Sequence, residues 1–193
     1  MSRHRRVLGI ELSAYVVRDQ YRLVFFGRVQ RALELIGRYE PRRLDRIRRD
    51  VRTICGMSGG PNVYHHVGRA IMLTMPTVLA SSPPELAMVI VHEATHGRID
   101  DRGIPYLAEN RSRIETACVR QETIFARRLP GGDALADASV GKLANPWWSD
   151  QDLVEWQLRT LKAEEVPPWL ARFVERMLKR RAARASRGAT VQQ

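Results

Sequence analysis

Apolar residues recur at helical spacing along residues 18–39, and this periodicity predicts a first helix. The positions that carry it are Tyr21, Val24, Phe25, Leu35 and Ile36, together with the aliphatic stem of Arg28. Proline at position 41 lacks a backbone N–H, so the helix is expected to end before it. Residues 50–57 then show β-branched residues in partial alternation, which is typical of a strand.

A glycine-rich loop at residues 58–62 follows, and residues 63–74 predict another strand or hairpin arm. The strongest helix signal in the chain comes next. Ser82, Pro83 and Glu85 together form a capping box around a proline start. The body that follows, residues 86–91, is apolar on every side, so this helix is expected to be buried. Gly97 stands where a glycine often ends a helix.

The remainder of the chain is predicted to be mostly helical. A long helix is expected over about residues 107–129, followed by an irregular connection over residues 133–146. Two more helices are expected over residues 150–164 and 169–184. The pattern therefore predicts an α+β fold, with a small N-terminal sheet, a buried helix after it and a largely helical C-terminal part.

The length of 193 residues and the apolar content of 44% suit a single compact domain with one core. Four segments are expected within this domain over residues 1–193: an N-terminal helical segment (1–49), a core (50–129), C-terminal helices (133–185) and a disordered tail (186–193). No run of eighteen apolar residues predicts a membrane span. Glu11 interrupts the apolar run near the N-terminus, which argues against a secretory signal and favours a cytoplasmic protein.

Two cysteines, Cys55 and Cys118, are too few for a disulfide framework. A packing role is expected for both, with a place lining the candidate site as the alternative for Cys118, which lies one turn from Glu115. The net charge of +11 comes from arginine-rich runs at residues 3–6, 42–49 and 179–187. These runs have no interleaved aromatic residues and match no nucleic-acid-binding motif, so nucleic acid is an unlikely partner. These runs are expected to be solvated surface. The net charge mildly favours an acidic substrate or partner.

The buried helix contains His92-Glu93-Ala94-Thr95-His96, an HExxH sequence. Residues four apart face the same side of a helix, so the two imidazoles can converge on one metal ion. Glu93 is placed to accept a proton from the attacking water and act as general base. Because burying two histidines and a glutamate without partners costs several kcal/mol, a bound cation is the simplest compensation.

The motif and its neighbours resemble the zincin metallopeptidases, over roughly residues 50–125. Val89 and Ile90 before the motif, uncharged residues within it and a small Gly97 after it fit the zincin pattern. Arg98 departs from that pattern, which usually has an apolar residue there. The resemblance implies a zincin-like fold, a zinc ion and hydrolysis of a peptide or protein substrate.

A hydrolytic zinc site needs a third protein ligand and one open position. The metzincin pattern requires a glycine and a histidine or aspartate where this chain has Ile99 and Arg102, so that branch does not fit. The gluzincins instead take a glutamate from a second helix. Glu115, nineteen residues after His96, is similar to that glutamate, and small residues follow it as they do in gluzincins.

Other acidic residues remain alternatives to Glu115 as third ligand. Glu109 and Glu122 are the main ones, and Glu122 could instead hold a ligand histidine in place from behind. Asp100 and Asp101 follow the motif too closely for an easy return of the chain.

The sequence does not single out the residue that would donate a hydrogen bond to an oxyanion, because no histidine or tyrosine follows residue 106. The candidates are Tyr64, His65, His66, Tyr106 and Arg120. Residues 67–75 are expected to form the edge strand that pairs with an extended substrate. An alternative to a peptidase is a catalytically inactive zinc-binding protein that acts through its basic surface on a protein or nucleic-acid partner.

Overall fold

A computed structural model describes residues 3–14, 17 and 19–144. The chain divides into two units, Met1–Asn145 and Pro146–Gln193, and the second lies outside the described residues. The helices expected at 150–164 and 169–184 and the tail 186–193 also lie outside them. The prediction of one domain over residues 1–193 therefore stays a prediction.

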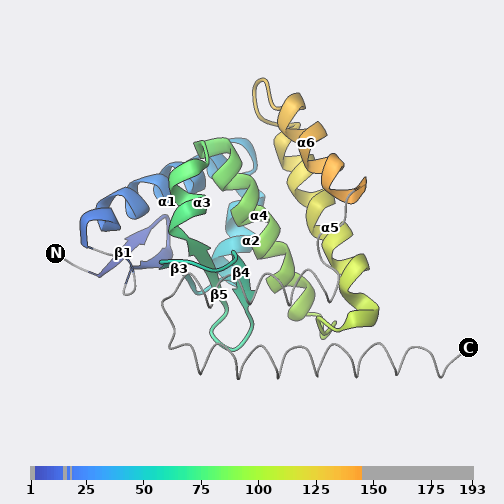
Figure 1. Cartoon of the computed structure of the whole chain (residues 1–193), viewed down its shortest axis with the longest axis horizontal. Coiled ribbons are helices and arrows are strands. Elements are labelled where there is room, and N and C mark those ends of the chain that lie inside the picture. The colour runs from blue at the N-terminus through green and yellow to red at the C-terminus, as the bar shows by residue number, and fades with distance from the viewer. Residues whose placement is uncertain (1–2, 15–16, 18, 145–193) are drawn as a thin grey trace, which may run out of the picture. The chain divides into compact units, whose positions relative to one another are not determined.

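The described unit is α+β, as the sequence predicts, with a small mixed sheet in its N-terminal half (Figure 1). Its strands are β1 (His4–Val7), β2 (Ile10–Ser13), β3 (Thr53–Met57), β4 (Val63–His65) and β5 (Ala70–Thr74). Its helices are α1 (Asp19–Tyr39), α2 (Pro41–Asp50), α3 (Met75–Ala80), α4 (Pro83–Asp100), α5 (Ala108–Ala126) and α6 (Asp133–Ala144). None of the helices described here is long and apolar enough to cross a membrane.

The five strands lie in the order β1-β2-β3-β5-β4. Strands β2, β3 and β5 run parallel, and β1 and β4 pair antiparallel at the two edges. Because β5 lies between β3 and β4, it is not an edge strand, and the prediction that residues 67–75 form the edge is wrong. The strand nearest to α4 with a free edge is β4.

The core forms where α1 and α4 pack on the sheet and on each other. Helix α1 buries Phe25, Val29 and Leu33, which recur every fourth residue along one face. They meet Ile54 and Leu73 of the sheet in the same apolar cluster. Fully burying such side chains contributes about 1.5–3 kcal/mol each, so this cluster fixes the position of α4.

The start of α4 follows the sequence prediction. The Ser82 side chain accepts the backbone N–H of Glu85, and the Glu85 side chain accepts that of Ser82, which completes the capping box. The end differs, because Gly97 does not terminate the helix, which continues to Asp100. Gly97 instead allows close packing: a Cβ at this position would lie 2.6 Å from the ring of Tyr64 on β4.

Two other segments differ from the prediction. The first strands replace the beginning of the expected helical segment 1–49, and they join through Leu8 and Gly9, which both have positive φ. Residues 133–144 form α6 where an irregular connection was expected. Helix α6 packs on α5 (Figure 1), and this contact brings additional side chains to the site described next.

Candidate metal centre

Helices α4 and α5 bring His92, His96 and Glu115 together. The Nε2 atoms of the two histidines are 3.2 Å apart. Glu115 Oε2 lies 3.2 Å from Nε2 of His92, and Glu115 Oε1 lies 3.5 Å from Nε2 of His96. These three residues, called the ligand cluster below, are the ones that the spacing of the motif and the resemblance single out.

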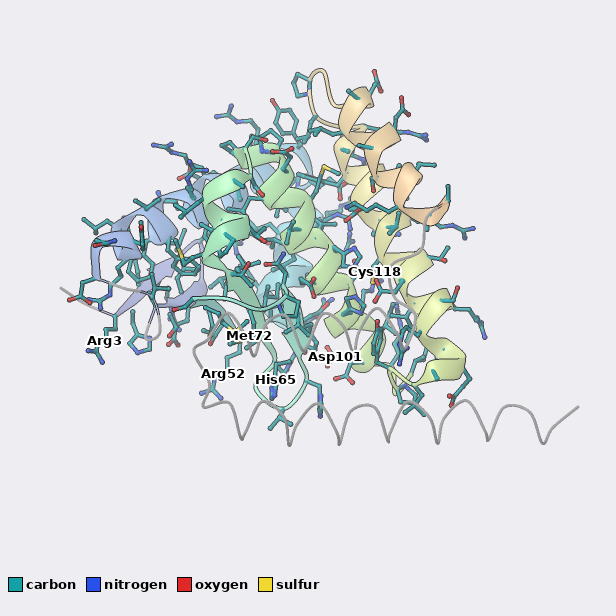
Figure 2. The ribbon with its side chains drawn as sticks, in the orientation of Figure 1. Arg3, Arg52, His65, Met72, Asp101 and Cys118 are labelled. Carbon is teal, nitrogen blue, oxygen red and sulfur yellow. The ribbon has the colours of Figure 1, made fainter. Side chains whose placement is uncertain are left out.

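Cys118 joins the same cluster from one turn further along α5. Its Sγ and one nitrogen of each of His92 and His96 all lie within 4.8 Å of one another, so this group could hold a metal ion. The side chain is fully buried, and burial raises the pKa of its thiol well above the ordinary range. Figure 2 shows Cys118 on the side of α5 that faces α4. The expected packing role for Cys118 is therefore incomplete.

Glu122 holds the other nitrogen of His92. His92 Nδ1 lies 3.1 Å from Glu122 Oε2, so Nε2 is left to face the ligand cluster. The second oxygen, Glu122 Oε1, accepts hydrogen bonds from Ser139 and from Lys142 Nζ, the latter at 2.6 Å. Although burial opposes ionisation, the contacts with His92 and Lys142 outweigh it and lower the pKa of Glu122. Glu122 is thus an anchored carboxylate behind His92, a candidate metal ligand.

Glu93 is buried beside the cluster. Burial raises its pKa to about 7, and His92 and the backbone N–H of Tyr64, which donates to the carboxylate, act in the opposite direction. A carboxylate with a pKa in this range can both accept and release a proton near neutral pH.

The pKa values of the two imidazoles shift in opposite directions. Burial disfavours charge on His92, yet its contacts with the carboxylates of Glu115 and Glu122 prevail and raise its pKa to about 10. Burial lowers the pKa of His96 to about 4. At neutral pH His96 is therefore neutral and offers a lone pair, while His92 without a metal ion is protonated and paired with Glu115 and Glu122.

Tyr106 reaches the cluster from the loop before α5. Its hydroxyl donates a 2.5 Å hydrogen bond to Glu115 Oε1, and its ring meets that of His96 edge-on with centroids 5.5 Å apart. The side chain remains 44% exposed, so it lies between the ligand cluster and solvent. Of the candidate oxyanion donors in the described part of the chain, Tyr106 is the one that contacts the ligand cluster.

The donor set suits a cation by two observations. Glu115 Oε2 is buried and has no hydrogen-bond partner among the described residues, although it lies close to His92. Such an unmatched acceptor costs free energy unless a cation or donor meets it. In addition, Glu93, Glu115 and Glu122 are all buried, and the ammonium group of Lys142 pairs with Glu122 alone. When both imidazoles are neutral, as metal ligation requires, the three carboxylates outnumber the one ammonium group, and a divalent cation would offset the difference.

The other candidates lie outside the cluster. Glu109, Asp100, Asp101 and Arg120 are exposed, and the structure gives none of them a contact with the two histidines. His65 and His66 are exposed and stack on each other at the β4–β5 turn, where Figure 2 labels His65. Ser139 and Lys142 were not foreseen, because their contribution depends on α6, which the sequence did not predict.

A comparison of the chain with family models, with curated proteins and with solved structures finds no match.

Proposed function

We propose that this chain is a small zinc-dependent hydrolase of the metallopeptidase type, similar in its ligand set to the gluzincins. The observation that carries the proposal is the convergence of His92, His96 and Glu115 from two helices, with Glu93 buried beside them. Two imidazoles and one carboxylate with room for a further ligand are typical of hydrolytic zinc sites. Zinc bound there supplies a Lewis acid that polarises a carbonyl and makes water acidic enough to attack at neutral pH.

Glu93 is the general base in this proposal. A free carboxylate would be a poor base at neutral pH, but burial raises the pKa of Glu93 to about 7. Its oxygens can therefore take the proton of the attacking water and pass it to the leaving amine. The backbone N–H of Tyr64 holds the carboxylate in position for both transfers.

Glu122 orients His92 for ligation. A proton on Nδ1 of His92 is held by Glu122 Oε2, which leaves the lone pair of Nε2 directed at the cluster. Ser139 and Lys142 fix Glu122 in turn. Because the tautomer and orientation of His92 are already fixed, metal binding costs less conformational entropy.

Tyr106 is the proposed donor to the developing oxyanion. Its hydroxyl already lies at the cluster, and its partial exposure lets a substrate carbonyl reach it. For substrate binding, we assign the pairing edge to β4 in place of residues 67–75. Strand β4 is at the edge of the sheet and contacts α4, so an extended peptide paired with it would pass along the active-site helix.

The alternative, an inactive zinc-binding protein, draws on Cys118. If the thiolate takes the position that water needs, four protein ligands close the site, as in structural zinc centres. The basic surface of the chain would then act on a partner.

The deciding experiment combines metal analysis with one isosteric substitution. We expect near-stoichiometric zinc in the purified protein by elemental mass spectrometry, and hydrolysis of members of a peptide library. In Glu93→Gln, zinc should remain and hydrolysis should fall by at least about 100-fold, because the general base is lost. Equal hydrolysis in this variant, or no zinc after incubation with the metal, would contradict the proposal. Zinc without hydrolysis in the native protein would favour the closed site.

A further inference from the structure

A cavity of about 280 Å³ lies between α2, α4 and α5. Four arginines line it: Arg43 and Arg46 of α2, Arg98 near the end of α4, and Arg102 just beyond it. We call it the arginine pocket. It is distinct from the ligand cluster, because none of His92, His96 and Glu115 lines it.

The positive charge in the arginine pocket is only partly neutralised by its surroundings, which include Glu40 and Asp50. Within the described part of the chain, Arg46, Arg98 and Arg102 have no ion pair. The nearby carboxylates are already engaged: Glu40 pairs with Arg43 and Arg128, and Asp50 pairs with Arg49.

The arginines also repel one another at close range. Partial burial is the first cause that lowers the pKa of Arg46, and the charges of Arg43 and Arg98 lower it further. Clustered arginines without counterions destabilise the folded state, and such clusters are common at sites that bind anions. The mutual repulsion of the arginines therefore supports anion binding in the pocket, in addition to its geometry.

The floor of the pocket is apolar. Ile47 of α2 and Val91 and Ala94 of α4 are buried there, and Gln121 of α5 holds Arg43 through a 3.1 Å hydrogen bond. A cavity of this size is larger than a bare inorganic anion needs, and it is at the lower end for small organic ligands. Its lining thus combines apolar and cationic side chains.

We propose that the arginine pocket binds a small organic molecule that carries a phosphate group. Guanidinium groups match phosphate oxygens with paired hydrogen bonds, and several of them can surround one dianion. The apolar floor would receive the organic part of the ligand. This site is independent of the metal centre, and it stands whether or not the chain is a hydrolase.

Isothermal titration of the full chain with phenyl phosphate, and in parallel with inorganic phosphate, tests the proposal. We expect one phenyl phosphate per chain and weaker binding of inorganic phosphate, because only the first occupies the apolar floor. Arg46→Gln and Arg98→Gln should each weaken phenyl phosphate binding by about tenfold or more, as expected for a lost charged hydrogen bond. Arg46→Lys should restore part of the affinity.

Arg31→Gln, on the exposed side of α1, is the matched control and should leave binding unchanged. Absence of phenyl phosphate binding, or an equal loss in Arg31→Gln, would overturn the proposal. Titration with a short DNA duplex and with polyglutamate separates the macromolecular alternatives. If either binds through Arg46 and phenyl phosphate does not compete, the pocket belongs to a macromolecular interface and the proposal is wrong. Unchanged circular dichroism in each variant shows that the loss is not unfolding.

Discussion

Nδ1 of His92 lies 3.1 Å from Oε2 of Glu122, a carboxylate that is 1% exposed. This contact connects the motif helix α4 to α5, and through Ser139 and Lys142 it reaches α6. A ligand histidine held in this way has one nitrogen committed to the protein and the other free for a cation. The relationship explains why a glutamate seven residues after Glu115 is buried.

The first prediction concerns that contact. Glu122→Gln should weaken zinc binding by about 10–100-fold, because the neutral amide no longer supports the ligand histidine. The measurement is competition with a chelator of known affinity. Glu109→Gln, on the exposed side of the same helix, is the control and should bind zinc as the native protein does. Equal affinities in all three proteins would show that Glu122 has only a packing role.

Cobalt substitution distinguishes an open site from a closed one. In the open site that we propose, the cobalt protein should lack the near-ultraviolet absorption of a thiolate–cobalt bond. Cys118→Ser should then retain the metal with less than about a threefold change in affinity, well below the 10–100-fold change expected when a residue that supports a ligand is lost. A strong thiolate band in the native protein, absent from Cys118→Ser, would assign Cys118 as a ligand and favour the inactive alternative.

Two glycines in helices should respond oppositely to the same substitution. Gly97→Ala should destabilise the fold by about 1–3 kcal/mol, because the new Cβ would lie 2.6 Å from the Tyr64 ring. Gly27→Ala, where nothing lies within 4 Å, should stabilise it by up to about 1 kcal/mol through helix propensity. Urea unfolding of both variants measures the difference. A stabilising Gly97→Ala would mean that Tyr64 moves away freely.

Removal of one charge from the arginine pocket should stabilise the protein. Burial and the neighbouring arginines lower the pKa of Arg46, which means that its charged form is less favourable in the folded state than in the unfolded chain. Arg46→Gln should therefore raise the melting temperature slightly. The gain in the free energy of unfolding should stay within about 0.5 kcal/mol, because the group is largely solvated. Thermal unfolding at low salt checks this, and a lower melting temperature would contradict it.

Local signals in the sequence predicted the parts of the structure that depend on local chemistry. The capping box at Ser82 and the periodicity of α1 and α5 needed no tertiary information, and the helices begin where the sequence indicated. The spacing of the HExxH motif also predicted that His92 and His96 would face one another, since it follows from helix geometry alone.

The remainder depended on long-range packing. Glu115 and Glu122 are seven residues apart on one face of α5, so spacing alone could not decide which contacts Nε2 and which contacts Nδ1 of His92. The internal place of β5 reflects strand order, which the local pattern does not contain. Helix α6 was missed because the glycines before it indicate a loop and its alanine-rich sequence has little apolar periodicity.

The anchoring of Glu122 by Ser139 and Lys142 limits how the site can be transplanted. A protein engineer who grafted α4 and α5 onto a new scaffold would copy every ligand of the cluster and still omit the residues that hold Glu122 in place. A graft that keeps the candidate ligands and the residues that hold Glu122 therefore needs at least α4, α5 and α6, and it ends beyond Lys142.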